Sequence, residues 1–338
     1  MTHTLEIRTS PHVLSGHRVE TIMFNVVLAL LPTAAWAVWC FGLKALLVLA
    51  TAVLSCLLTE RLACALSGRA SSLGDGSVAI TGLLYGLTLP PGLPLWMVAV
   101  GGVIGVGLGK ALFGGLGANP FNPALVARAF LQAAFPVAMT SWLPPLAGER
   151  FTSLPGSTLA APFSRAVVDG WSGATPLAGF KFSGELTALG DLATGAVAGS
   201  LGETSGVLIL LGGAWLVARN MMSWRIPAGL FAVVAGASAL LHAVAPEAYA
   251  PPGFMLFSGG LMLGAVFMAT DMVASPMTGT GCLLYGALIG ALVMVIRVWG
   301  GMPEGVMYAI LLANAVSPHI DRWIRPRVFG QAAAEGGG

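Results

Sequence analysis

Charged residues are scarce in this sequence. Only 9% of its 338 residues are Asp, Glu, Lys or Arg, whereas soluble domains carry roughly 25%. A water-soluble fold of this length could not cover its surface with so few charges. The formal net charge of +2 is also too small to indicate a nucleic-acid partner. These shortages exclude an ordinary soluble domain and favour a chain embedded in a membrane.

Metal-ligating residues are few and unsuitably spaced. The four cysteines, at positions 40, 56, 64 and 282, all lie in apolar runs and form no C-x-x-C pair. The five histidines include no His-x-x-His pair. The sequence therefore predicts no metal and no self-contained iron–sulfur centre. A P-loop and a dinucleotide fingerprint are also missing, so we do not expect the chain itself to bind NADH or ATP.

Hydrophobic residues, in contrast, make up 56% of the chain and gather in ten apolar segments. A bilayer core of about 30 Å requires roughly 20 apolar residues as a helix. Seven stronger segments cover 21–40, 43–66, 95–113, 205–218, 226–244, 279–298 and 305–316. Three short or broken ones cover 78–89, 122–135 and 255–270. The sequence thus predicts an all-α integral membrane protein with about ten transmembrane helices.

The chain also contains a candidate internal sequence repeat. Leu112-Phe113-Gly114-Gly115 precedes the fifth segment, and Val298-Trp299-Gly300-Gly301 precedes the tenth, at an offset of 186 residues. Five helices per half is an odd number, so the halves would have opposite orientations. We therefore predict two inverted five-helix repeats with short discontinuous helices. The alternative is chance, because Gly-Gly pairs are common in a chain with 46 glycines.

The distribution of lysine and arginine predicts the orientation. Ten of the 16 lie on the side of the termini and five on the other, three of these in the long loop 137–204. Both termini should therefore be cytoplasmic, and the long loop should face outward. The predicted order is a cytoplasmic tail (1–20), a first membrane repeat (21–136), the extracytoplasmic loop (137–204), a second membrane repeat (205–318) and a cytoplasmic tail (319–338).

The long loop holds Asp169-Gly170-Trp171-Ser172-Gly173-Ala174-Thr175-Pro176. Small neighbours should leave the Thr175 hydroxyl accessible. The N–H groups of Ser172, Gly173 and Ala174 could cradle a phosphate as a backbone nest. A small-residue turn begun by Ser172 accounts for the same residues without a ligand, and on the residues alone it is the favoured interpretation.

Ser-Gly-Ala-Thr in an outward loop resembles the covalent flavin attachment motif of the RnfD/NqrB family. Three further segments carry the resemblance, Gly114-Gly115-Leu116-Gly117-Ala118-Asn119-Pro120-Phe121-Asn122-Pro123-Ala124-Leu125-Val126, Phe267-Met268-Ala269-Thr270-Asp271 and Pro303-Glu304-Gly305-Val306. The resemblance spans about residues 10–325, with one departure at Met272, where the family pattern leads us to expect Pro. The short N-terminal tail and Ser-Gly-Ala-Thr-Pro resemble the RnfD branch of the family, which belongs to Rnf-type ion-translocating electron-transport complexes.

The resemblance implies a membrane flavoprotein with FMN esterified through its phosphate to Thr175. It places Asp169, Ser172, Gly173 and Ala174 in the segment that a flavin transferase reads. It also implies a bacterial inner-membrane translocase that couples electron transfer between NADH and ferredoxin to movement of Na⁺ or H⁺. The implied partners are membrane lipid and Rnf-type subunits A, B, C, E and G, and a second, non-covalent flavin such as riboflavin is expected.

Polar side chains at membrane depth form a second candidate site. Asn119, Asn122, Asp271 and Glu304 lie in or beside apolar segments, and we predict that they line a pocket for an ion or the second flavin. Asp271 is the first choice for that role. The alternative is structural: Asn and Glu cap broken helices, and Arg128 pairs internally or extends toward the interface.

Two other functions fit the same architecture. One is an inverted-repeat channel or solute transporter without a redox cofactor, and the other is a scaffold that only anchors partners. The segment 169–175 discriminates them from a redox subunit, because a simple channel or scaffold does not need it.

The orientation is testable by labelling. A cysteine that replaces Gly170 should react with a membrane-impermeant thiol reagent added outside intact cells, because the charge distribution places the loop outside. The unsubstituted chain is the control, since its own cysteines lie in apolar runs. Labelling that occurs only from the inside would overturn the predicted topology.

Overall fold

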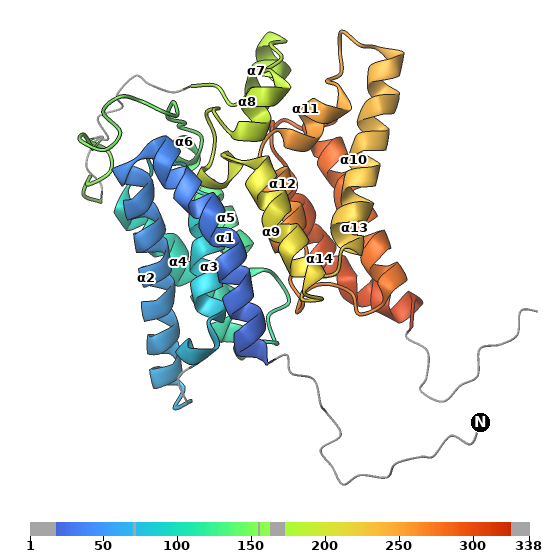
Figure 1. Cartoon of the computed structure of the whole chain (residues 1–338). Coiled ribbons are helices and arrows are strands. Elements are labelled where there is room, and N and C mark those ends of the chain that lie inside the picture. The colour runs from blue at the N-terminus through green and yellow to red at the C-terminus, as the bar shows by residue number, and fades with distance from the viewer. Residues whose placement is uncertain (1–17, 70–71, 155, 163–172, 326–338) are drawn as a thin grey trace, which may run out of the picture.

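The computed structural model describes residues 18–325 except 70–71, 155 and 163–172. Within these ranges the chain forms helices and no β-strand, which confirms the predicted all-α class. Figure 1 shows the helices of the first half (blue to teal) beside those of the second half (yellow to red). The first helix begins and the last helix ends on one side, and α7 and α8 lie on the opposite side.

The first half begins with two long helices and continues with shorter ones. Its elements are α1 (Val19–Phe41), α2 (Leu43–Leu66), η1 (Leu73–Asp75), α3 (Ser77–Leu87), α4 (Leu95–Gly109), η2 (Ala111–Phe113), α5 (Pro123–Ala134) and α6 (Pro136–Met139). Gly42 separates α1 from α2 with a φ of 76°, and a Cβ there would lie 1.9 Å from the Arg150 carbonyl oxygen. Only glycine fits this reversal.

The second half begins with three short elements, α7, α8 and η3, which follow the junction between the halves. Its elements are α7 (Pro176–Ser183), α8 (Leu189–Thr194), η3 (Leu201–Glu203), α9 (Gly206–Ala218), α10 (Arg225–Val244), α11 (Pro252–Phe257), α12 (Leu261–Leu263), the π-helical η4 (Gly264–Met268), α13 (Gly279–Trp299) and α14 (Val306–Trp323). The segment predicted as short and broken, 255–270, is divided at Gly259, where φ is 66°.

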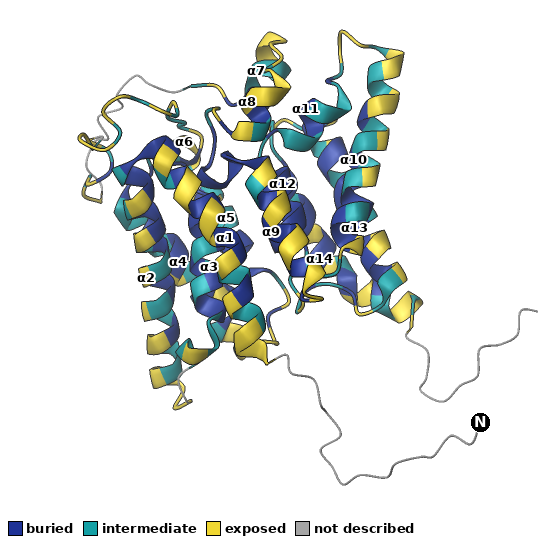
Figure 2. Ribbon diagram, in the orientation of Figure 1, coloured by how far each residue is buried: buried dark blue, intermediate teal, exposed yellow. Residues whose placement is uncertain are grey.

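Among the described residues, five helical segments are long and apolar enough to cross a membrane. They are Val19–Phe41, Leu43–Leu66, Leu95–Phe113, Arg225–Val244 and Gly279–Trp299. The other predicted segments are also helical but do not meet this criterion, so ten spans in two inverted repeats stay a prediction. Large apolar residues such as Phe24, Leu58 and Leu62 are more than half exposed. Figure 2 shows that exposed residues recur along the outer faces of α1 and α2. Such faces are typical of contact with lipid or partner subunits.

Glycines bring α10 and α13 into backbone contact. A Cβ on Gly286 would lie 2.2 Å from the Ile226 carbonyl oxygen, and one on Gly229 would lie 2.5 Å from the Leu283 carbonyl oxygen. Small residues at membrane-helix interfaces allow this close approach, which increases van der Waals contact. The pair therefore forms a closely packed unit within the second half.

Replacing Gly286 with Ala should separate these helices, because the added methyl group meets backbone and not a movable side chain. We expect a loss of about 1–3 kcal/mol in the free energy of unfolding, typical of overpacking. Gly236→Ala on α10 is the matched control, since no atom lies within 4 Å of its Cβ position. Unfolding in detergent, followed by tryptophan fluorescence, compares them; equal stability of the two variants would contradict the packing argument.

Candidate functional site

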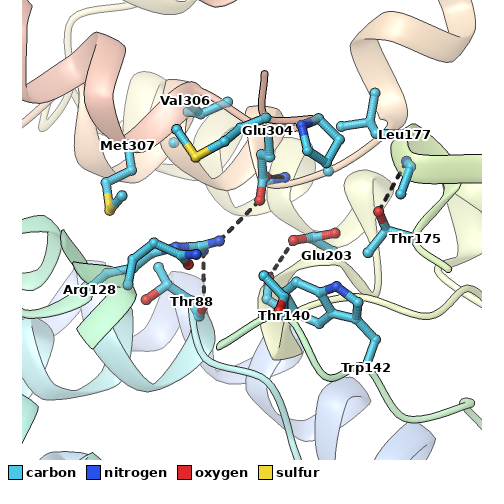
Figure 3. Close-up of a pocket in the computed structure, with 18 of the residues that line it drawn as sticks. Thr88, Arg128, Thr140, Trp142, Thr175, Leu177, Glu203, Glu304, Val306 and Met307 are labelled. Atoms are coloured by element: carbon cyan, nitrogen blue, oxygen red, sulfur yellow. Dashed lines mark hydrogen bonds and ion pairs between the residues drawn. The ribbon is translucent and has the colours of Figure 1, made fainter. Parts of the chain in front are cut away.

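A pocket of about 450 Å³ is lined by residues of both halves, on the side of α7 and α8. We call it the outer pocket, and Figure 3 shows it in close-up. Its lining includes Leu125, Arg128, Trp142, Thr175, Glu203, Leu263, Glu304 and Met307. Ligand pockets in proteins commonly range from about 300 to 1,000 Å³ with mainly apolar walls and a few polar groups. The outer pocket has this size and this mixture.

Thr175 lies at the edge of the outer pocket as the N-cap of α7. Its Oγ1 accepts a hydrogen bond from the Ala178 N–H at 3.2 Å, and Pro176 occupies the first helical position. This is the arrangement that Thr-Pro favours at a helix start. Only 9% of Thr175 is exposed, so its hydroxyl is less accessible than the sequence suggested.

The backbone ahead of Thr175 corrects one detail of the predicted phosphate nest. The Gly173 N–H is not free, because it donates to the Trp142 carbonyl oxygen at 3.0 Å. Gly173 and Ala174 line the outer pocket beside Thr175. Asp169 and Ser172 lie outside the described residues. The attachment role of these five positions stays a prediction.

An ion pair crosses the outer pocket from one half to the other. Arg128 on α5 meets Glu304, in the loop ahead of α14, with 3.0 Å between Nη2 and Oε2. Arg128 also donates to the Thr88 carbonyl oxygen at 2.8 Å. Glu304 further accepts from the Gly260 N–H at the break before α12. Of the two alternatives for Arg128, internal pairing is confirmed.

Glu203 is the second carboxylate of the outer pocket. It lies in the turn η3 ahead of α9, is 8% exposed, and accepts a hydrogen bond from Ser200 Oγ at 2.7 Å. Burial, and then the negative charge of Glu304, raise the pKa of Glu203 to about 8. Ser200 and Arg128 oppose this shift only in part. Its surroundings therefore make Glu203 bind a proton more readily than an ordinary glutamate.

Lys181 ties the Thr175-bearing helix to the second half. Its Nζ donates to three carbonyl oxygens, of Arg297 at 2.9 Å, Gly300 at 2.5 Å and Met302 at 3.2 Å. These carbonyls lie at the C-terminal end of α13 and just beyond it, where a cation is favourable. Partial burial lowers the pKa of Lys181. One side chain thus holds α7, and with it Thr175, over the pocket.

A second pocket of about 110 Å³, the inner pocket, lies beside the start of α5. It is lined by Asn119, Asn122, Asp271 and Lys110, while Glu304 lines the outer pocket. The single pocket predicted for Asn119, Asn122, Asp271 and Glu304 is therefore wrong. The reason is that α5 begins at the inner pocket whereas α14 begins at the outer one, so the two helices run in opposite directions.

The polar groups of the inner pocket are engaged in local bonds. Asn122 caps α5, its Oδ1 accepting from the Ala124 N–H at 3.0 Å, which confirms the capping alternative for this residue. Asp271 accepts from the Val273 N–H at 3.1 Å. Lys110 pairs with Glu60 at 3.0 Å. An ion or cofactor role for Asn119, Asn122 and Asp271 stays a prediction.

Glu203 and Lys181 were not predicted from the sequence. Glu203 carries a usable signal, because a glutamate directly before an apolar span lies near membrane depth, where acidic groups are costly and generally functional. Lys181 has no comparable signal. Its three partners lie more than 100 positions away along the chain, and only the folded structure brings them together.

Comparisons with known proteins agree with the family resemblance described for the sequence. The family model described as "NQR2, RnfD, RnfE family" matches residues 6–330. The chain is 42% identical to the D component of the "Ion-translocating oxidoreductase complex" of Stutzerimonas stutzeri over 340 residues, with 93% of each chain covered. It is 38% identical to the D component of the "Proton-translocating ferredoxin:NAD(+) oxidoreductase complex" of Clostridium ljungdahlii, with 96% of each chain covered.

Lys181→Met should loosen α7, because the variant keeps the apolar stem and loses the three N–H donors. Bonds from a charged donor contribute roughly 1.5–3 kcal/mol, so amide exchange over 176–183 should accelerate roughly ten- to a hundredfold. Hydrogen exchange measured by mass spectrometry tests this. Glu185→Gln, an exposed position just after α7, is the control; unchanged protection in Lys181→Met would remove the anchoring role.

Proposed function

The chain belongs to the NQR2, RnfD, RnfE family, and we propose that it is the RnfD component of an Rnf-type ion-translocating oxidoreductase complex and carries FMN covalently on Thr175. The observation that carries the proposal is the position of Thr175. Its hydroxyl oxygen lies at the edge of a pocket of about 450 Å³ that both halves line. A group attached there would be held between the two halves of a membrane protein.

The residues of the outer pocket fit such a group. A phosphate on Thr175 would lie at the N-terminus of α7, where the helix dipole favours negative charge. Leu125, Leu263 and Met307 supply apolar walls for a planar ring, and Trp142 supplies an aromatic one. FMN, when bound, transfers one or two electrons and so connects carriers of different kinds. The chain contributes binding, orientation and the electrostatic surroundings of the ring.

The wider proposal concerns the complex. In it the chain passes electrons on the path between NADH and ferredoxin, while the complex moves Na⁺ or H⁺ across a bacterial inner membrane. Rnf-type subunits A, B, C, E and G would be its partners, and a separate flavin transferase would attach FMN. The family assignment favours this over a channel or scaffold without a redox cofactor.

The proposed topology is ten transmembrane helices in two inverted repeats, with both termini cytoplasmic and the Thr175 loop periplasmic. It is supported by the opposite placement of two equivalent helices. The fifth predicted segment (α5) begins at the inner pocket and the tenth (α14) begins at the outer pocket. Opposite directions of corresponding helices are what an inverted repeat requires.

The proposal includes a second, non-covalent flavin such as riboflavin. The inner pocket is the candidate, because Asn119, Asn122 and Asp271 offer polar groups there. Its volume of about 110 Å³ lies below the usual range for ligands. Binding in the inner pocket would therefore require side chains to move apart.

Covalent attachment is tested on a denaturing gel. The full-length chain, co-expressed with a flavin transferase, should give a band that fluoresces under ultraviolet light, because a phosphoester to Thr175 survives denaturation. Thr175→Ala should abolish the fluorescence, since no hydroxyl remains to form the ester. Thr140→Ala removes another hydroxyl from the lining of the same pocket and should leave the band bright.

Two results would contradict the proposal. A dark wild-type band, with the transferase shown to be active on another substrate, would exclude covalent flavin. A fluorescent Thr175→Ala band would place the attachment on a different residue. The protein level of each variant is read from the same gel by immunodetection, so a weak band is not mistaken for a loss of flavin.

A further inference from the structure

Glu203 is a buried carboxyl group that lines the outer pocket beside Thr175, Arg128 and Glu304. Its position is fixed by backbone. The Leu201 N–H in the same turn donates to the Leu89 carbonyl oxygen at 3.0 Å, and a Cβ on Gly202 would lie 2.6 Å from Leu263. The carboxyl group therefore keeps a fixed place in the pocket wall.

The cations near Glu203 are bound to other groups. Arg128 forms its ion pair with Glu304 and donates to the Thr88 carbonyl. Arg297, on α13, is 4% exposed and donates to the Met255 and Ser258 carbonyl oxygens at 2.6 and 2.9 Å. Among the described residues, the salt bridge in the lining of the outer pocket joins Arg128 to Glu304. Glu203 instead accepts its hydrogen bond from the neutral hydroxyl group of Ser200.

The two carboxyl groups of the pocket therefore differ in character. Glu304 pairs with the Arg128 guanidinium and accepts a hydrogen bond from a backbone N–H. Glu203 is shielded from water and faces that same negative charge, which favours its neutral form. The elements packed against its turn, α1, α3 and α12, bring apolar side chains and backbone such as Leu87 and Leu263. The charged groups that act on it are Glu304, Arg128 and Arg297.

Resting on the proposed flavin, we propose that Glu203 is the proton-binding group that compensates the charge of an electron entering the outer pocket. An added negative charge in a poorly solvated pocket raises the proton affinity of a nearby carboxylate. When one electron enters while Glu203 is ionised, its carboxylate takes one proton from water, so the net charge of the pocket is unchanged. The electron comes from another one-electron carrier of the complex, which is oxidised. When the electron leaves, the proton returns to water.

This role has a defined pH range. In the flavin-free chain, burial and the negative charge of Glu304 raise the pKa of Glu203 to about 8. Well below that pH the carboxyl group already holds its proton, so the electron meets a neutral group. Above it the electron meets a carboxylate, which makes reduction less favourable unless a proton binds. The reduction potential of the pocket should therefore fall with rising pH through Glu203 only from about pH 8 upward.

The test compares midpoint potentials of the flavin-loaded, full-length chain with those of Glu203→Gln, measured spectroelectrochemically at several pH values. Glutamine resembles the protonated carboxyl group at every pH. The two proteins should therefore have the same potential at about pH 6, and the variant should have an increasingly higher one from about pH 8 upward. Glu185→Gln, an exposed neighbour of α7, should follow the wild type throughout.

Two further variants separate titration from damage to the pocket. Glu203→Asp keeps a carboxyl group and should keep a pH-dependent potential. Ser200→Ala removes the hydrogen bond that stabilises the carboxylate, so the pH dependence should begin at a higher pH. In flavin-free Thr175→Ala protein, infrared spectroscopy should show a carboxyl group that titrates near pH 8 and disappears in the double variant with Glu203→Gln.

The outcomes distinguish the two proposals. A dark wild-type gel band means that the flavin proposal fails. A fluorescent wild type whose potential differs from that of Glu203→Gln by the same amount at all pH values, or not at all, overturns the role of Glu203 alone. A carboxyl group that does not titrate near pH 8 in the flavin-free protein overturns it independently of any flavin.

Discussion

The ion pair between Arg128 and Glu304 is the contact on which the outer pocket depends. It joins α5 of the first half to the loop ahead of α14 in the second. The same carboxylate binds the Gly260 N–H and so closes the break before α12. A charge held away from water is tolerated only when an opposite charge and hydrogen bonds surround it. Because each partner needs the other, the pair fixes the two halves relative to each other.

Two further cations, Arg297 and Lys181, serve breaks in the backbone. Where a helix stops inside an apolar environment, its carbonyl oxygens lose their partners and must find new donors. Arg297 supplies them to Met255 and Ser258, and Lys181 supplies them at the end of α13. Arg128, the cation in the described lining of the outer pocket, is likewise bound to Glu304 and to the Thr88 carbonyl oxygen. Burial is therefore the main influence on Glu203, and it favours the neutral form.

The sequence predicted helices well where one physical signal was dominant. The apolar run 43–66 matches α2, because Gly42 marks the start of the helix and the length of the run marks its end. Asn122-Pro123 predicted the start of α5 because an N-cap and a proline act locally. The site was predicted less well. Thr175 was identified by resemblance, whereas Glu203 depends on contacts between distant segments. Glu304 and Asn119 were predicted to line one pocket because both lie near the start of a helix. The two helices run in opposite directions, so their starts lie at different pockets.

The short helices place the two pockets against each other. No residue lines both pockets among those described, yet Leu125 and Met268 line the outer one while their close neighbours Asn122 and Phe267 line the inner one. The Asn122 side chain donates to the Met268 carbonyl oxygen at 3.4 Å across this thin wall. If flavins occupy both pockets, little polarisable solvent separates their charges. Charge interactions are strong in such surroundings. A proton on Glu203 would then weaken the field that an electron in the outer pocket exerts on the inner one, so its protonation would set how strongly the two pockets influence each other.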